Sequence, residues 1–319
     1  MAKQEEKEIP VYMFRGFLES GKTTFIMNTL QDPYFYNGER TLLIACEEGE
    51  EEFDPAILEK YNTVLVTVEK QEELSAAFME ECNRKYQPDR VMIEYNGTWV
   101  LGDTLMITAP DDWIFVQTIT TIDASTYQSY MGNMGSIMIE QYRDADMVLF
   151  NRCNETTKKS FMRSNVKAVN RRAQVLYEAA EDSEFDEDED DLPFDVNANV
   201  IDIEDDDYGL WYMDALDNPE KYKGKTVHFK AMVYKGPRYP KDTIVPGRHA
   251  MTCCADDIAF VGFMCKGEAC KNLQKRDWVY VTAQVKVEFI PEYREKGPML
   301  YAQKIEKAEA PKEQLVYFN

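Results

Sequence analysis

The sequence predicts an α/β domain with a mostly parallel sheet and helices on both faces, followed by a small all-β barrel domain. Apolar strand-like runs alternate with helical runs from residue 9 to 179, and short strands and turns replace this pattern from residue 218. Strands separated by helices are typical of a parallel sheet that is covered on both faces. We therefore expect domains at 9–179 and 218–319. An acidic linker with an aromatic docking segment, 180–217, would join them.

Six apolar runs are the strand candidates of the first domain. They are Val11–Phe14, Thr41–Ala45, Thr63–Val68, Arg90–Glu94, Trp113–Ile122 and Met147–Phe150. Crossovers between parallel strands are right-handed, and ligands of such sheets bind at the carboxyl ends of the strands. We therefore expect ligand-binding and catalytic residues in the loops that follow these runs.

The loop after the first strand carries a complete G-x-x-x-x-G-K-[ST] motif, and an amphipathic segment follows it. Residues 16–24 read Gly-Phe-Leu-Glu-Ser-Gly-Lys-Thr-Thr. The glycines let backbone N–H groups turn toward phosphates, and the helix N-terminus adds positive potential. Lys22 is expected to contact the β- and γ-phosphates, and the Thr23 hydroxyl to ligate Mg²⁺. The ligand-binding candidates of this loop are Gly16, Ser20, Gly21, Lys22, Thr23 and Thr24. The motif predicts that the chain binds a nucleoside triphosphate.

Acidic and amide side chains follow three other strand candidates. Glu47 lies in the acidic loop after the second strand, and Glu94 ends the fourth. Either can be a surface acid at a strand end, or a group beside the γ-phosphate and its metal. Asn151-Arg152-Cys153-Asn154 stands where GTPases carry the N-K-x-D loop that reads guanine, so Asn151 and Asn154 are the base-binding candidates.

Taken in order, these motifs resemble the CobW/HypB/UreG nucleotide-binding family, most of all its CobW branch. Residues 16–24 correspond to G-F-L-G-x-G-K-T-T, residues 46–54 to the N-E-F-G-E-x-x-x-D switch, and residues 94–97 to E-T-x-G. Residues 121–124 resemble the later V-D-A strand end, and residues 141–146 the Q-x-x-x-A-D before the base loop. The resemblance implies a GTPase that delivers transition metals to client proteins, with GTP and Mg²⁺ as its cofactors.

The resemblance, applied residue by residue, implies that three side chains take part in catalysis and that three bind Mg²⁺. The catalytic candidates are Lys22, Glu47 and Glu94, and the Mg²⁺ candidates are Thr23, Glu47 and Glu94. The roles of Glu47 and Glu94 are to position metal or water, and no single catalytic base is assigned.

Two departures from the family pattern bear on function. The stretch Tyr61–Val68 has no cysteine where CobW proteins carry C-x-C-C, and Cys46 stands where they carry Asn. Asn154 replaces the aspartate that accepts two hydrogen bonds from guanine, a loss of about 1.5–3 kcal/mol. We expect a weak or altered guanine preference. An alternative function is a non-catalytic nucleotide-binding module whose barrel binds a protein partner.

Overall composition limits the partners and the compartment. The net charge is −22, which argues against nucleic acid as a partner and is compatible with metal cations or basic proteins. The chain has no apolar run of membrane-spanning length and no apolar signal core near Met1, so we expect a cytoplasmic protein that does not bind membranes. Seven cysteines in a reducing compartment argue against disulfides.

The C-terminal part predicts a barrel of the OB type. Its strand candidates are Thr226–Tyr234, His249–Cys254, Ile258–Cys265, Trp278–Glu288 and Met299–Lys307. A helical segment, Gly267–Lys275, separates the third candidate from the fourth, and this is the chain order of an OB-type barrel.

Cysteines and a histidine of the barrel form the second candidate site. His249, Cys253 and Cys254, with Cys265 and Cys270, can supply a Zn²⁺ site or can be small buried core residues. Residues 224–311 also resemble the C-terminal domain of YcgQ-type proteins that accompany a permease, which implies a role in metal homeostasis, with zinc as the metal. The matching stretches are Gly224-Lys225, Val233-Tyr234, Pro246-Gly247-Arg248, Met251–Asp256 and Ala310-Pro311. Lys235, Arg238, Lys241 and Arg248 form one local basic cluster, which keeps nucleic-acid binding open despite the overall acidity.

Overall fold

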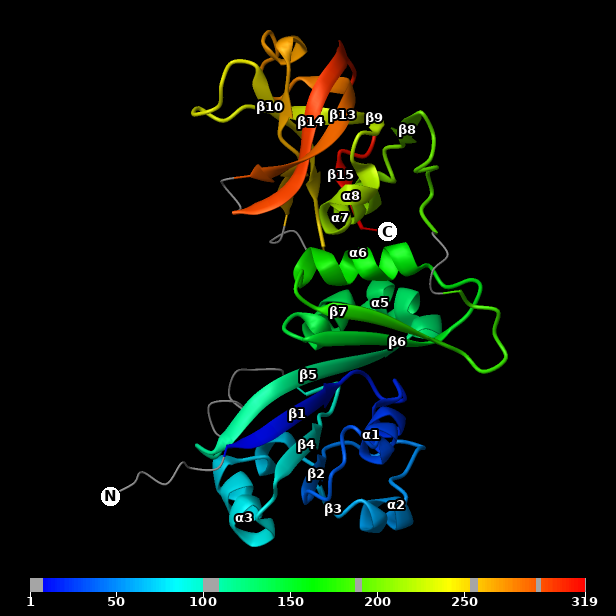
Figure 1. The fold of residues 1–319 in the computed structure, drawn as a ribbon, viewed down its shortest axis with the longest axis vertical. Coiled ribbons are helices and arrows are strands. Elements are labelled where there is room, and N and C mark those ends of the chain that lie inside the picture. Colours follow the sequence, from blue (N-terminus) through cyan, green and yellow to red (C-terminus); the bar gives the residue numbers. More distant parts are fainter. Residues whose placement is uncertain (1–7, 100–108, 187–190, 253–257, 291–293, 319) are drawn as a thin grey trace. The chain divides into compact units, whose positions relative to one another are not determined.

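A computed structural model describes residues 8–99, 109–186, 191–252, 258–290 and 294–318. The chain divides into two compact units (Figure 1). The first contains residues 1–157 and 170–187, and the second contains residues 158–169 and 188–319. Each unit is described by itself.

The first unit is built on a seven-stranded parallel sheet. Its strands are β1 (Ile9–Arg15), β2 (Thr41–Ala45), β3 (Thr63–Thr67), β4 (Arg90–Glu94), β5 (Trp113–Asp123), β6 (Met147–Cys153) and β7 (Gln174–Ala179). Its helices are α1 (Lys22–Gln31), α2 (Pro55–Lys60), α3 (Ala76–Tyr86) and α5 (Ala124–Tyr142), with a 3₁₀ turn at Gln71–Glu73. The strand order is β3-β2-β4-β1-β5-β6-β7, and every pair is parallel. The predicted α/β fold class is confirmed.

Alternate residues of the central strands supply two separate cores, one on each face of this sheet. Leu43 and Met92 pack with Ile26 and Leu30 of α1, whereas their neighbours in β2 and β4 pack with Met79 of α3. Side chains alternate between the faces of a strand, so an uninterrupted apolar run fills both cores. The predicted bounds of β2 and β4 are therefore confirmed to the residue.

The seventh strand, β7, was not predicted. Its sequence, Gln-Val-Leu-Tyr-Glu-Ala, mixes polar and apolar residues because β7 is an edge strand that pairs only with β6. Edge strands bury less of their surface, so the uninterrupted apolar run of a central strand is missing. The strand nevertheless matters, because its carboxyl end borders the site described below.

The second unit is a closed barrel with short helices. Its helices are α6 (Lys159–Val169), α7 (Tyr208–Asp217) and α8 (Pro219–Tyr222), and β8 (Val200–Ile203) pairs with the first barrel strand. The remaining strands are β9 (Thr226–Tyr234), β10 (Thr243–Ala250), β11 (Ala259–Gly262), β12 (Cys265–Lys266), β13 (Trp278–Ile290), β14 (Glu295–Lys307) and β15 (Leu315–Val316). Pairing runs β9-β13-β14-β12-β10 and returns from β10 to β9, which closes a five-stranded ring. The predicted barrel is confirmed.

Local details of the barrel differ from the prediction. β10 begins at Thr243, six residues before the predicted start, because Pro246 and Gly247 read as turn residues but lie within the strand. The third strand is divided into β11 and β12, and the predicted helix Gly267–Lys275 is only a 3₁₀ turn at Glu268–Cys270. Pairing with neighbouring strands therefore overrode local turn propensity.

Residues 180–217, expected to link the domains, include regular structure that belongs to the second unit. β8 extends the barrel sheet, and Tyr208 and Trp211 of α7 are buried in the barrel core against Phe229. The aromatic side chains of this segment are therefore part of the barrel core. Within the described ranges, every helix is too short or too polar to cross a lipid bilayer.

Candidate functional site

The glycine-rich loop connects β1 to α1 at the carboxyl edge of the sheet. Gly21 precedes the helix with φ of 90°, and a Cβ there would lie 2.5 Å from Nδ2 of Asn151. Only glycine satisfies both conditions without strain. The predicted loop geometry is therefore present, with the N-terminal N–H groups of α1 unused by any capping side chain.

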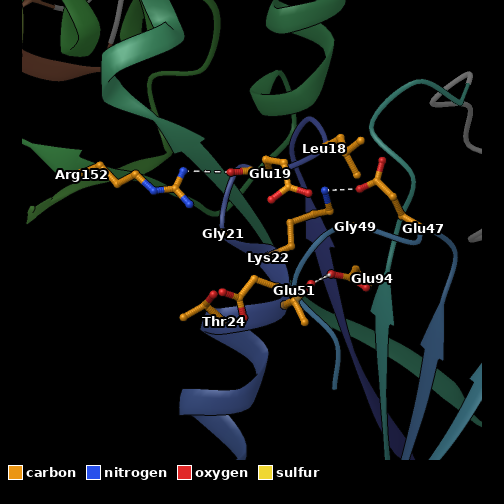
Figure 2. A pocket seen from close by; sticks show the side chains of 11 residues that line it. Leu18, Glu19, Gly21, Lys22, Thr24, Glu47, Gly49, Glu51, Glu94 and Arg152 are labelled. Atoms are coloured by element: carbon orange, nitrogen blue, oxygen red, sulfur yellow. Dashed lines mark hydrogen bonds and ion pairs between the residues drawn. The ribbon is translucent and has the colours of Figure 1, made fainter. Parts of the chain in front are cut away.

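Lys22 is the buried cation of this loop. Its ammonium donates hydrogen bonds to the carbonyl oxygens of Gly16 (2.9 Å) and Phe17 (2.8 Å), and it forms an ion pair with Glu47 (Figure 2). The Lys22 side chain is 3% exposed and the Glu47 side chain 8%. Glu47 lies in the loop between β2 and α2, so it can leave without moving the sheet. A phosphate that reaches Lys22 must replace this carboxylate.

Thr23 and Glu94 lie together at the ends of α1 and β4. The Thr23 hydroxyl donates a 2.7 Å hydrogen bond to Oε1 of Glu94. Burial raises the pKa of Glu94, and the nearby Glu47 carboxylate raises it further, against the lowering effects of Thr23 and Lys22. A hydroxyl and a buried carboxylate supply oxygen ligands, which Mg²⁺ prefers. The donor set therefore fits Mg²⁺ held by Thr23 and Glu94.

Cys46 is a buried thiol close to these carboxylates. Burial, together with Glu94 and Glu47, raises the pKa of the thiol to about 12. Among the described residues, Cys46 included, no three His, Cys, Asp or Glu side chains are grouped so that they could hold a metal ion. The described part of the chain therefore assembles no replacement for the missing C-x-C-C motif.

Two residues of the site, Glu19 and Arg152, were not singled out from the sequence. Glu19 has φ of 61°, and its carboxylate accepts a hydrogen bond from the Glu50 backbone N–H (2.9 Å). Arg152 donates to the Glu19 carbonyl oxygen (2.8 Å) and pairs with Asp123 at 2.7 Å. Glu19 could have been singled out from the sequence, because it occupies the position where the family motif has glycine. Together these contacts connect the phosphate loop with the switch loop and the base loop.

A cavity of about 790 Å³ lies beside the phosphate loop, bordered by α1 and by the carboxyl ends of β6 and β7. Asn151 lines it and donates from Nδ2 to the Ser20 carbonyl oxygen at 2.8 Å. The Oδ1 atom of Asn151 is buried and has no hydrogen-bond partner among the described residues. A buried acceptor without a partner at the wall of a cavity fits a ligand that donates a hydrogen bond.

Asn154 lies differently from Asn151. It is not among the residues that line the cavity, and its Oδ1 accepts hydrogen bonds from the Thr156 backbone N–H (3.0 Å) and hydroxyl (2.7 Å). The structure thus brings Gly21, Thr24 and Asn151 to the cavity, and leaves Asn154 in a local turn. Ala179–Glu181 at the end of β7 complete the wall, and the unpredicted edge strand explains why they were missed.

The second candidate site is not assembled among the described residues. His249 is exposed on β10 and its ring contacts Phe260, whereas Cys265 and Cys270 are fully buried in the barrel core. Cys253 and Cys254 lie outside the described residues. In the ranges that the structure covers, no three His, Cys, Asp or Glu side chains are grouped so that they could hold a metal ion.

Residues 10–177 match the family model described as CobW/HypB/UreG, nucleotide-binding domain, over more than half of the chain. The chain belongs to this family. Residues 179–318 match a second family model, described as DUF1980 C-terminal domain, so the two matches follow one another along the chain. Both resemblances stated from the sequence are thereby confirmed. None of the curated proteins matches the chain.

Several solved structures are similar to part of this chain. A Zn(II)-bound triple mutant of the YjiA GTPase is 21% identical with a TM-score of 0.44, and the match covers 56% of this chain and 59% of that one. HypB from Archaeoglobus fulgidus is 16% identical (55% and 82% covered, TM-score 0.40). HypB from Helicobacter pylori, solved with nickel, is 14% identical (55% and 81%, TM-score 0.39). This chain thus spans less than two thirds of the YjiA chain.

Proposed function

We propose that this member of the CobW/HypB/UreG family binds and hydrolyses GTP in a Mg²⁺-dependent reaction. The observation that carries the proposal is the convergence of Lys22, Thr23 and Glu94 at the carboxyl ends of β1 and β4. A buried cation, a hydroxyl and a carboxylate beside free helix N–H groups are the parts that phosphoryl transfer requires. Binding of the triphosphate is the first step.

In this proposal the residues act mainly by position and charge. When the triphosphate binds, the Lys22 ammonium gives up its ion pair with Glu47 and contacts the phosphates instead. Its hydrogen bonds to the Gly16 and Phe17 carbonyl oxygens hold the ammonium in place. Glu47, once released, is free to orient water or metal near the γ-phosphate. Mg²⁺, held by Thr23 and Glu94, would supply neutralisation of phosphate charge. The Asn151 amide accepts from the base while it donates to Ser20.

We further propose a role in transition-metal homeostasis or metal delivery, with zinc or cobalt as the cargo, a metal-requiring client protein and a cytoplasmic location. Family membership supports this part. The missing C-x-C-C motif separates this chain from the usual metal site of the CobW branch. A zinc site would therefore have to include Cys253 and Cys254.

Calorimetry and phosphate release test the proposal on one sample. GTP, ATP and XTP are titrated with and without Mg²⁺, and hydrolysis is compared between the wild type and Lys22→Ala. We expect Mg²⁺-dependent GTP hydrolysis that falls by about 10³-fold in the variant, because the buried cation is lost. Equal turnover of the two proteins would refute the enzymatic assignment.

Zinc titration of the same sample tests the metal role. Binding tighter than about micromolar that is lost in Cys253→Ser/Cys254→Ser would support it. Binding no tighter than that, in wild type and variant alike, would remove the metal-delivery role and leave the nucleotide site unaffected.

A second candidate function is a nucleotide-binding module without turnover, whose barrel binds a protein partner. The position of Asn154, outside the cavity and in a turn with Thr156, favours it. Tight nucleotide binding without phosphate release in the wild type would select this function over the first.

A further inference from the structure

Charge is distributed very unevenly between the barrel and the rest of the chain. The second unit, residues 158–169 and 188–319, carries 22 Lys and Arg against 24 Asp and Glu, a net charge of −2, whereas the rest of the chain carries 14 against 34, a net charge of −20. Within the second unit, residues 218–319 carry 18 against 12, a net charge of +6. The overall acidity therefore says little about the barrel. At about 0.1 M salt, charges more than about 10 Å apart are largely screened, so the local surface decides which partner binds.

Aromatic rings gather on the outer face of β9, β10 and β11. Register places His249 beside Phe260, with ring centroids 5.3 Å apart, and the Tyr234 ring lies 5.8 Å from that of Phe260. Gly247 is required beneath this cluster, because a Cβ there would lie 2.7 Å from the Phe260 ring. Tyr234 is 36% exposed and His249 is also exposed, so the cluster faces water rather than the core.

The loop between β9 and β10 surrounds these rings with cations. Tyr239 of this loop packs 6.3 Å from Tyr234 and against Gly236, which orders the loop. Lys235 donates to the Lys241 carbonyl oxygen at 3.0 Å, and Lys275 lies 5.4 Å above the Tyr234 ring. Arg238 and Lys241 are exposed. We call this surface the aromatic-basic face: Tyr234, Lys235, Arg238, Tyr239, Lys241, His249, Phe260 and Lys275.

The structure changes the composition of the basic cluster expected from the sequence. Arg248 does not belong to it: the side chain is 1% exposed, pairs with Asp205 at 2.8 Å and donates to the Glu313 carbonyl oxygen at 2.7 Å. Strand alternation turns Arg248 inward and its neighbours Gly247 and His249 outward. Lys275, distant in sequence, takes its place beside the rings.

We propose that the aromatic-basic face binds single-stranded nucleic acid. Unpaired bases stack on exposed rings, and phosphates pair with lysine and arginine, so this combination suits a single strand. A duplex hides the faces of its bases, and an acidic peptide has carboxylates but no bases. In the OB-type order of the barrel, β10 and β11 are the second and third strands, the face on which such barrels hold oligonucleotides. The site lies within the second unit and goes beyond the proposed GTPase function.

The test uses the full chain and a fluorescein-labelled 15-nucleotide oligothymidylate, followed by fluorescence anisotropy between 50 and 200 mM salt. We expect a Kd of about 10 μM at the lowest salt. Tyr234→Leu, which keeps the apolar volume but removes the ring, should weaken binding about tenfold, and Tyr234→Phe should restore it. Lys235→Gln/Arg238→Gln/Lys241→Gln should lower the salt-dependence slope by about 2, since each phosphate contact contributes about 0.7.

A matched control removes the same charge from another part of the barrel. Lys304→Gln/Lys307→Gln/Lys312→Gln changes exposed lysines on and after β14, which β12 and β13 separate from β10 and β9. The control should bind within twofold of the wild type. An equal loss in both triple variants would overturn the proposal, because charge alone would then explain binding.

Two further outcomes would also overturn it. One is no anisotropy change with the wild type at 50 mM salt. The other is tighter binding of a labelled 15-residue polyglutamate that Tyr234→Leu leaves unchanged, which would assign the face to an acidic protein. Lys22→Ala should bind the oligothymidylate like the wild type, so failure of the GTPase proposal and failure of this one are distinguishable.

Discussion

Lys22 in the first unit and Arg248 in the second are both buried basic side chains that pair with carboxylates, and their surroundings differ. The partner of Lys22 is Glu47, which is carried by a loop without regular structure. Arg248 lies between the rings of Tyr208 (5.9 Å) and Trp278 (5.4 Å) and bonds to Asp205. Asp205 also lies in a turn, and its side chain is 33% exposed against 8% for Glu47. Lys22 and Glu47 line a pocket beside the phosphate loop, so their ion pair can open for a ligand, whereas two rings flank the Arg248 guanidinium.

Burial and pairing with a carboxylate do not by themselves identify a functional cation. Both side chains are almost completely buried, at 3% and 1% exposure. Of the two, Lys22 lines a pocket together with its partner, whereas Arg248 is flanked by two aromatic rings.

Replacing each cation by alanine should separate a structural role from a functional one. Arg248→Ala leaves a cavity between two rings and two backbone carbonyls without their donor, and should cost about 3–5 kcal/mol of unfolding free energy. Lys22→Ala should cost less, about 1–3 kcal/mol, because Glu47 can turn to water although the Gly16 and Phe17 carbonyl oxygens lose their donor. Urea unfolding followed by Trp fluorescence measures both, and equal losses would contradict the distinction.

Glu94→Gln should keep the fold and remove most turnover. The amide oxygen can still accept the Thr23 hydroxyl, whereas the negative charge that suits Mg²⁺ is lost. We expect Mg²⁺-dependent hydrolysis to fall by about 10²-fold. Steady-state phosphate release measures the effect, and Glu59→Gln on the exposed side of α2 is the control. Turnover within threefold of the wild type would exclude Glu94 from the site.

Asn154→Asp should sharpen base selection if the base loop can rearrange around a nucleotide. An aspartate accepts from two donors of guanine, and a hydrogen bond to a charged group contributes about 1.5–3 kcal/mol. GTP affinity relative to ATP should rise by about tenfold in competition titrations. An unchanged ratio would mean that Asn154 stays in its turn with Thr156 and that the base is read by the cavity wall alone.

Glu47→Gln should weaken the competition for Lys22. Without the carboxylate, a diphosphate no longer has to displace an ion pair, so GDP affinity measured without Mg²⁺ should rise about threefold to fivefold. GTP hydrolysis should fall in the same variant if Glu47 positions water or metal. Weaker GDP binding would show that the Lys22–Glu47 pair supports the loop instead of blocking it.

Much of the first unit could be predicted from the sequence, because its strands and its phosphate loop are defined by neighbouring residues. The bounds of β2 and β4 and the loop Gly16–Thr24 follow from contiguous residues that obey one spacing rule. β7 and the wall at Ala179–Glu181 were missed, because an edge strand lacks the apolar run of a central one. The position of Asn154 was also missed, since only the folded turn shows its bond to Thr156.

The order of the barrel strands could be predicted from the sequence, but which side chains lie on the barrel surface could not. Arg248 looked like a surface cation, and its inward direction follows from the register of β10. The segment 180–217 looked like a linker, because acidic residues surround the few aromatic side chains that enter the barrel core.

The family, the two fold classes and the phosphate loop could be predicted from the order of residues, since each depends on periodicity or on contiguous spacing. The folded chain was needed to show which buried cation lines a pocket, which base-loop residue reaches the cavity, and which rings share the aromatic-basic face. The physical reason is that these properties depend on strand pairing between distant residues, because a shift of one position turns a side chain from water to the core.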